Sequence, residues 1–250
     1  MTASGASLAG RTVAVTGGSR GIGSAIVAEL AAAGATVGAL TRAGKGPEDR
    51  AVTGDVRHFA CDVTDESALR AALAELVATT GRLDAMVNNA GLFLEGRSRD
   101  FATEDFRRVM DTNVTAVFVG CREAYPHLVE AGGGTIVNLG SFFETLGTRY
   151  TAAYTASKAA VGAISRCLAV EWAKQKIRVL DVAPGFIATD LNRQAMEDER
   201  FNAFLRGRIP TGEPGTPEEV ARLIRLLIAE DLPFLTGTTI TIDGAQTINQ

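Results

Sequence analysis

Tyr154 and Lys158 stand four residues apart in a segment with helical periodicity. On a helix this spacing places both side chains on one face, and Val161, Ser165 and Leu168 continue the same stripe, which we expect to pack inward. A phenol ionises at about pH 10 in water, and a neighbouring ammonium favours its ionised form. The pair is therefore suited to general acid–base catalysis. A packed tyrosine beside a lysine that reaches solvent is the structural alternative.

Two further polar residues are candidates for the same chemistry. Ser141 follows a predicted strand over Thr135–Gly140, where a hydroxyl can donate a hydrogen bond to an oxygen on which negative charge develops. A serine that simply ends a strand in a turn is the alternative. Asn113 lies in the apolar stripe of a predicted helix, seven residues after Phe106. A buried amide must be hydrogen-bonded, so Asn113 is a structural residue, a part of the site, or both.

A glycine-rich segment near the N-terminus is suited to binding phosphate. Gly17, Gly21 and Gly23 lie between a predicted strand over Thr12–Thr16 and a predicted helix from Gly21 to about residue 33. Phosphates need close approach to backbone N–H groups, which side chains would block, and the start of a helix adds a positive dipole. In this strand–turn–helix setting the glycines indicate a dinucleotide site rather than a turn that only packs helix against strand.

Short strand-like runs alternate with helical periodicity along the chain. This order predicts an α/β fold: a Rossmann-like doubly wound parallel sheet of about seven strands with helices on both faces, in a single domain over 1–250. Helices are expected at 21–33, around Leu69–Val77, around Phe106–Val117, at Ala153–Lys174 and from Pro217. Strands are expected at Thr12–Thr16, Thr36–Leu40, His58–Cys61, Ala85–Asn88, Thr135–Leu139, Arg178–Val182 and Thr239–Ile242. The glycine-rich, charged segment Arg42–Cys61 leaves little room for a crossover helix, so a short or irregular one is expected there.

The order and spacing of these motifs resemble the short-chain dehydrogenase/reductase family. The resemblance extends from the first strand to the Asp243-Gly244 turn. The matching motifs are Gly17-x-x-x-Gly21-x-Gly23, Asp62-Val63, Asn88-Asn89-Ala90-Gly91, Asn113, Ser141, Tyr154-x-x-x-Lys158 and Pro184-Gly185. The resemblance implies an NAD(P)(H)-dependent oxidoreductase that interconverts a carbonyl and a secondary alcohol by hydride transfer.

The resemblance also implies a role for each site residue. Tyr154 exchanges a proton with the substrate oxygen, and Ser141 orients that oxygen. Lys158 binds the nicotinamide ribose, and Asn113 holds a water that relays protons from Lys158. The implied cofactor-binding residues are Gly17, Ser19, Arg20, Gly21, Ile22, Gly23, Arg42, Asp62, Val63, Asn89, Ala90, Gly91, Tyr154, Lys158, Pro184, Gly185, Ile187 and Thr189.

The end of the second strand bears on the choice between NAD and NADP. NAD-preferring relatives carry an acidic residue there that binds the ribose 2′-hydroxyl, whereas this chain has Thr41 followed by Arg42. A guanidinium suits a 2′-phosphate, and Arg20 in the glycine loop could add a second charge. NADP(H) is therefore favoured. NAD(H) remains the alternative, because the arginines could be solvated and Glu48 or Asp49 could approach the site.

Apolar residues cluster after the catalytic strand ends and predict an apolar substrate wall. They are Leu92, Phe93, Phe142, Phe143, Tyr150 and Phe186. Residues 190–210 are expected to form a substrate lid. Two positions depart from the family: Glu144 stands where relatives often have glycine and could shape the pocket, and Leu180 replaces a usual asparagine in the sixth strand, which affects packing.

Composition narrows the other classes of function. The chain has 46% hydrophobic and 22% charged residues with a net charge of −4, so the basic field that nucleic-acid binding needs is missing, and no apolar run is long enough to span a membrane. Cys61, Cys121 and Cys167 are widely spaced, and there are two histidines, so we expect no disulfide, no metal site and a cytoplasmic location. The resemblance implies a homotetramer or homodimer.

Alternative functions remain open at this point. A 3-oxoacyl thioester reductase would bind an acyl carrier protein through exposed basic residues, and the candidates are Arg97, Arg99, Arg107 and Arg108, which could equally form a solvated helix face. A dehydrogenase of a small cyclic, sugar or polyol alcohol is a second reading. A catalytically silent nucleotide-binding sensor or scaffold is a third, against which the complete serine, tyrosine and lysine set argues.

Overall fold

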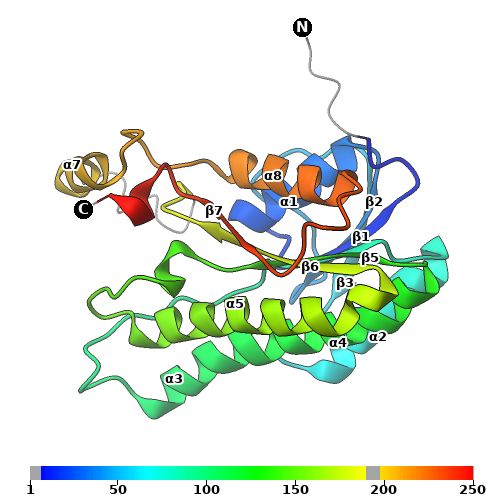
Figure 1. Ribbon diagram of the computed structural model, residues 1–250, viewed down its shortest axis with the longest axis horizontal. Helices are drawn as coiled ribbons and strands as arrows, with labels where there is room; N and C mark the ends of the chain where they lie inside the picture. Colours follow the sequence, from blue (N-terminus) through cyan, green and yellow to red (C-terminus); the bar gives the residue numbers. More distant parts are fainter. Residues whose placement is uncertain (1–6, 190–197, 250) are drawn as a thin grey trace, which may run out of the picture.

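Seven strands form one parallel sheet in the order β3-β2-β1-β4-β5-β6-β7 (Figure 1). The computed structural model describes residues 7–189 and 198–249. The strands are β1 (Thr12–Thr16), β2 (Thr36–Thr41), β3 (Asp55–Ala60), β4 (Ala85–Asn88), β5 (Gly134–Leu139), β6 (Ile177–Pro184) and β7 (Thr239–Ile242). The order reverses between β1 and β4, and doubly wound sheets bind ligands in the crevice at the carboxyl ends of such strands.

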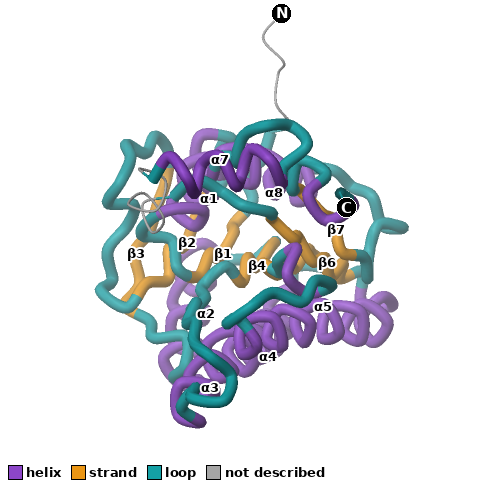
Figure 2. Tube along the Cα trace, turned by 90° about the vertical axis from the view of Figure 1, so that its left-hand side faces the viewer, coloured by secondary structure: helices purple, strands orange, loops and turns teal. Residues whose placement is uncertain are grey.

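Helices cover both faces of the sheet (Figure 2). α1 (Gly21–Ala32) and α8 (Pro217–Ala229) lie on one face, and α2 (Glu66–Thr80), α4 (Ala116–Glu130) and α5 (Ala152–Trp172) lie on the other. The other helical elements described include α3 (Thr103–Met110), α7 (Glu199–Arg208) and the short 3₁₀ turns η2 (Phe142–Glu144), η3 (Ala173–Gln175) and η5 (Gln246–Ile248). The predicted doubly wound α/β architecture is confirmed.

Two apolar cores, one on each face, hold the layers together. Val15 and Ile224 are fully buried between the sheet and the α1–α8 pair, and Leu73 and Ile136 are fully buried on the opposite face. Because both faces are covered, β1 and β4 are buried along their whole length and show no polar alternation. Within the described ranges, the structure contains no helix that is long and apolar enough to cross a membrane.

The helix predicted around Phe106–Val117 is interrupted. A π-helical turn, η1 (Asp111–Thr115), lies between α3 and α4. The wider turn changes the helical phase, so Phe106 is 41% exposed, whereas Asn113 inside the turn is fully buried. The prediction that Phe106 and Asn113 lie in one stripe of a single helix is therefore wrong.

Several other boundaries differ from the sequence prediction, and those of β3, β6 and α5 differ most. β3 begins at Asp55 rather than His58, because it pairs in register with the whole of β2. β6 extends to Pro184 along its pairing with β7, and α5 ends at Trp172, where η3 takes over. Residues 42–54 contain no helix, which agrees with the irregular connection expected there.

A substitution at Gly23, in the first turn of α1, tests how closely this helix packs against the preceding loop. A Cβ at this position would overlap the Gly17 carbonyl oxygen, so Gly23→Ala must displace backbone. We expect the free energy of unfolding to fall by about 1–3 kcal/mol, as at other overpacked sites, in urea denaturation. Gly207→Ala in α7 is the control, because a Cβ there would meet nothing within 4 Å. Equal stability losses in the two variants would contradict the prediction.

Candidate active site

Helix α5 presents Tyr154 and Lys158 at its N-terminal end, beside the carboxyl end of β5. Lys158 is 6% exposed, and its Nζ donates a hydrogen bond of 2.6 Å to the Leu139 carbonyl oxygen. The same Nζ lies 5.6 Å from the centroid of the Tyr154 ring. A buried ammonium requires such partners. The contact therefore fixes the start of α5, with Tyr154 on the same face, against the sheet edge.

Ser141 follows β5 at the same edge. It is 5% exposed, and its Oγ accepts a hydrogen bond of 3.3 Å from the Phe143 amide at the start of η2. The Phe143 ring in turn meets the Tyr154 ring edge-on, with 5.9 Å between the centroids. Because Lys158 binds the last residue of β5, the serine, tyrosine and lysine converge around one strand end.

Asn113 is positioned by the π turn and is fully bonded. Its Oδ1 accepts from the Leu92 amide at 2.7 Å, and its Nδ2 donates to the Leu92 carbonyl oxygen at 2.9 Å and to Ser157 Oγ at 3.0 Å. Ser157 precedes Lys158 on α5, so this amide ties the loop after β4 to the catalytic helix. The structural role that the sequence left open is thus present. A part in proton relay stays a prediction.

The glycine loop is bound to the end of β4. Asn89 Nδ2 donates to the carbonyl oxygens of Thr16 at 2.9 Å and Gly17 at 3.2 Å, and the Ala90 amide donates to Thr16 Oγ1 at 3.1 Å. Gly17 and Gly21 have positive φ angles of 69° and 59°, where a side chain would be strained. The Asn89 side chain therefore shapes the loop itself, a contact that its sequence-based assignment to the cofactor did not foresee.

The start of α1 suits the pyrophosphate of a dinucleotide. Its first turn contains no acidic residue, and its N-cap residue Arg20 makes no side-chain capping bond, so the N–H groups and the helix dipole favour an anion. Asp49 Oδ2 accepts one of these groups, the Gly21 amide, at 2.8 Å. Burial alone would raise the pKa of Asp49, but hydrogen bonds from Ser24, Arg50 and the Gly21 amide hold it below its ordinary value.

The segment after β2 approaches the glycine loop, as the alternative reading of Glu48 and Asp49 anticipated. The Glu48 amide donates to the Ser19 carbonyl oxygen at 2.8 Å. Thr41 Oγ1 is bonded to the Lys45 backbone, with distances of 2.7 and 3.0 Å. Arg42, the next residue, is exposed at the sheet edge.

Asp62 and Val63 follow β3 at the same edge. The backbone and hydroxyl hydrogen bonds from Thr64 hold the pKa of Asp62 below its ordinary value, and the charge of Arg42 acts in the same direction. Asp62 is exposed and Val63 is half-buried. The structure thus brings Arg42 close to Asp62, another of the predicted cofactor-binding residues.

The segment after β6 lies at the same edge of the sheet. Gly185, after the last strand residue Pro184, donates its amide to the Ile242 carbonyl oxygen at 2.9 Å. Ile187 is 7% exposed. Thr189 reaches the glycine loop, since a Cβ on Gly21 would lie 3.6 Å from the Thr189 methyl group. Thr189, one of the predicted cofactor-binding residues, is thereby adjacent to the start of α1.

Aromatic rings surround Tyr154. Phe93 and Phe143 meet its ring edge-on, at centroid distances of 4.9 and 5.9 Å. Phe186 lies 5.5 Å from Phe142 and 6.5 Å from Phe143. Four of the predicted wall residues therefore form one connected group of rings with the candidate acid–base residue.

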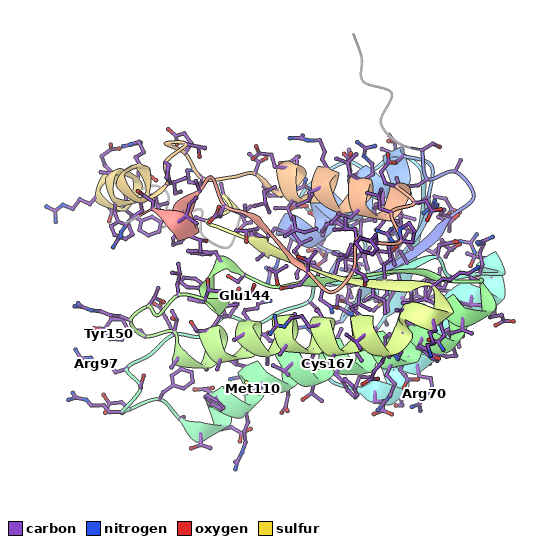
Figure 3. All side chains as sticks on the ribbon, in the orientation of Figure 1. Arg70, Arg97, Met110, Glu144, Tyr150 and Cys167 are labelled. Atoms are coloured by element: carbon purple, nitrogen blue, oxygen red, sulfur yellow. The ribbon has the colours of Figure 1, made fainter. Side chains whose placement is uncertain are left out.

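Two residues differ from the predicted wall. Tyr150 is 49% exposed with a φ of 71°, and it lies at the outer end of the molecule near Arg97 (Figure 3). Phe201 of α7 joins the rings at 6.2 Å from Phe186, although the sequence did not single it out. Its spacing of four residues from Leu205, which is 1% exposed, was the available signal. Residues 190–197 of the predicted lid lie outside the described residues.

Comparison with known proteins shows to which family this site belongs. The family model described as enoyl-(acyl carrier protein) reductase matches residues 17–247. A 3beta-hydroxysteroid dehydrogenase of Eggerthella lenta is 36% identical over 96% of this chain and 95% of its own, and a glucose 1-dehydrogenase of Gluconobacter oxydans is 37% identical over 96% and 93%. A gluconate 5-dehydrogenase structure from Burkholderia cenocepacia, in complex with NADP and tartrate, has a TM-score of 0.89 at 30% identity over 98% of both chains. The chain belongs to the short-chain dehydrogenase/reductase family.

As a short-chain dehydrogenase/reductase, the protein is an NAD(P)-dependent oxidoreductase that interconverts a CH–OH group and a carbonyl. The similarity to dehydrogenases favours this activity over a catalytically silent sensor and over a 3-oxoacyl thioester reductase. Three of the arginines proposed for carrier-protein binding form ion pairs with neighbouring acids: Arg99 with Asp100 at 3.1 Å, Arg107 with Glu104 at 4.0 Å, and Arg108 with Asp105 at 2.8 Å. The three side chains are exposed and paired with acids of their own segments.

Removal of the Asn113 amide should destabilise this short-chain dehydrogenase/reductase. Asn113→Ala leaves the Leu92 amide, the Leu92 carbonyl and Ser157 without their partner, and we expect about 1–3 kcal/mol less free energy of unfolding. Urea denaturation measures the change. Thr79→Ala, which removes an exposed hydroxyl bonded within α2, is the control. An Asn113→Ala variant as stable as this control would show that the amide does not tie the β4 loop to α5.

Proposed function

We propose that this short-chain dehydrogenase/reductase interconverts an apolar cyclic or aromatic ketone and its secondary alcohol with NADP(H). The observation that carries the substrate class is the group of rings around Tyr154: Phe93, Phe142, Phe143 and Phe186. Aromatic walls bury apolar carbon, whereas a sugar or polyol needs hydrogen-bond partners for each of its hydroxyl groups. The apolar ketone is therefore preferred over the sugar and polyol alternatives.

The catalytic roles follow from the hydrogen bonds of the site. Ser141 Oγ accepts from the Phe143 amide, so its own O–H is available to donate to the substrate oxygen. Tyr154 passes a proton to that oxygen in reduction and takes it back in oxidation. Of the three N–H donors of the Lys158 ammonium, one binds Leu139, and the others suit ribose hydroxyl groups. A bound nicotinamide supplies or accepts the hydride at the substrate carbon.

The preference for NADP(H) is supported by the charges at the end of β2. Thr41 stands where an acidic residue would bind the 2′-hydroxyl, and its own hydroxyl is used by the Lys45 backbone. Arg42 is exposed beside it, and Arg20 is exposed in the glycine loop. The two guanidinium groups suit the 2′-phosphate. Asp49 accepts a hydrogen bond from the Gly21 amide, so its carboxylate is not placed to accept one from a ribose 2′-hydroxyl.

We further propose a cytoplasmic homotetramer or homodimer with residues 190–210 as the substrate lid. Phe118 on α4 is 41% exposed and Val170 on α5 is 82% exposed, so the outer face of these helices offers apolar area to a second copy. Cys61, Cys121 and Cys167 are free thiols, which suits a reducing compartment. Phe201 of α7 reaches the aromatic wall and supports the lid.

Tyr154→Phe tests the acid–base role. The variant keeps the ring contacts but loses the transferable proton, so we expect kcat to fall by roughly 10²–10⁴-fold with little change in cofactor affinity. A panel of cyclic and aromatic ketones with NADPH, followed by nicotinamide absorbance, measures turnover, and fluorescence titration measures binding. Tyr125→Phe is the control, since that ring packs against Trp172 at a centroid distance of 4.9 Å. Full activity of Tyr154→Phe would end the proposed mechanism.

Arg42→Ala tests the cofactor preference. Loss of a charge-assisted contact with the 2′-phosphate should lower kcat/KM for NADPH by about 10–100-fold and leave kcat/KM for NADH nearly unchanged. Arg99→Ala, which removes an exposed arginine on the loop before α3, controls for a general loss of positive charge. A wild-type enzyme that prefers NADH would overturn the NADP(H) assignment.

A further inference from the structure

Two carboxyl groups meet beneath the turn that carries Ser141. Glu144 is the last residue of η2, and Asp181 is a fully buried residue in the middle of β6. Figure 3 shows Glu144 between α5 and the sheet. A Cβ on Gly162 would lie 2.8 Å from Glu144 Oε2 and 3.5 Å from Asp181 Oδ2, so the two carboxyl groups border the same small space. Acidic side chains rarely occupy such positions without a partner, so the pair requires an explanation.

The hydrogen-bond pattern of the pair is complete only if one proton is shared. Glu144 Oε2 and Asp181 Oδ1 are buried and have no hydrogen-bond partner among the described residues when both groups are ionised. The other Asp181 oxygen, Oδ2, accepts from Thr239 Oγ1 at 3.0 Å. Ionised carboxylates only accept, whereas a protonated one also donates. One proton between the two groups therefore satisfies the buried oxygens.

Two glycines make room for the carboxyl groups. A Cβ on Gly162 of α5 would lie 2.8 Å from Glu144 Oε2, and a Cβ on Gly140, the residue before Ser141, would lie 2.5 and 2.8 Å from the two Asp181 oxygens. Any larger residue at either position would displace an acid. The space beneath the serine turn is thus shaped around this pair.

The charges that surround the pair favour a single proton rather than none or two. Burial and the charge of Asp181 raise the pKa of Glu144 to about 7, and burial also raises the pKa of Asp181. From α5, Arg166 acts on Glu144 and Lys158 acts on Asp181, and both favour ionisation. From β7, the Thr239 hydroxyl group donates to Asp181 and also favours its ionised form. These cations and donors stabilise one negative charge on the pair.

We propose that Glu144 and Asp181 share one proton, and that the resulting hydrogen bond holds the η2 turn so that Ser141 and Phe143 face Tyr154. The Glu144 amide donates to the Ser141 carbonyl oxygen at 3.0 Å, so the turn is closed at both ends. Loss of the shared proton leaves two buried negative charges that repel each other, which releases the turn. Glu144 and Asp181 are positioning residues, and this role rests on the proposed function of Ser141 and Tyr154.

The pH dependence of stability tests whether the proton is shared. Folding raises the pKa of Glu144 from its ordinary 4.5 to about 7, so the wild type should lose stability as the pH rises from about 4.5 to about 7, with no further loss from this group at higher pH. Glu144→Gln supplies a permanent donor to Asp181, and its Tm should lack this decline. Infrared spectroscopy should show a protonated carboxyl band near pH 6 in the wild type that is lost in Glu144→Gln. Glu75→Gln, on the exposed face of α2, is the matched control.

Turnover tests whether the pair positions the serine. Glu144→Ala should lower kcat by about tenfold or more, as expected for a small displacement of a catalytic group, with little change in the KM for NADPH. Glu144→Gln should restore kcat and keep it to higher pH than the wild type. An unchanged kcat in Glu144→Ala overturns the positioning role. Identical Tm profiles and infrared bands in the wild type and Glu144→Gln overturn the shared proton.

These readouts separate the pair from the proposed function. If no carbonyl compound is turned over by the wild type, the proposed function fails, while the Tm profiles and infrared bands still decide whether the proton is shared. If Tyr154→Phe is inactive and Glu144→Ala is fully active, the mechanism stands and the positioning role is rejected.

Discussion

The buried ammonium of Lys158 is the contact on which the active site depends. An ammonium that is removed from water without a partner destabilises the fold strongly, and here its partner is the carbonyl oxygen of the last residue of β5. The contact prevents α5 from sliding along the sheet. It therefore fixes Tyr154, one turn earlier on the helix, next to the strand end from which Ser141 emerges. The positions of Tyr154 and Ser141 relative to each other therefore follow from where the Lys158 ammonium can be buried.

Polar links continue below this contact. Asn88 Nδ2 donates to Asn138 Oδ1 at 2.8 Å, and Asn138 Nδ2 donates to Ser165 Oγ at 2.9 Å, so buried side chains connect β4, β5 and α5. Asn113 adds a connection from the π turn to the loop after β4. Satisfied polar networks of this kind allow one arrangement, whereas apolar contacts tolerate several. The layers are held together by apolar burial, and the site is set by these amides.

The sequence was informative wherever a feature is local. Period and turn residues placed the strands and most of the helices, and glycines at positive φ marked the loop before α1. The predictions that were wrong concern features that the local pattern of residues does not determine. The phase of the helix around Phe106 is changed by the π turn, and the start of β3 is set by its pairing with β2. Phe201 was missed because its partner, Phe186, lies on another element.

The sequence by itself determined three things: which residues can ionise, which helix face carries Tyr154 and Lys158, and which glycines let a phosphate approach a helix. Only the tertiary structure decided how the polar groups pair. Asn89 binds the glycine loop, Asp49 binds the start of α1, and Glu144 meets Asp181 because β5 and β6 are neighbours in the sheet. Local spacing is read from the chain because helix and strand periods are fixed by the backbone. Pairings across elements depend on strand order, which no single segment encodes.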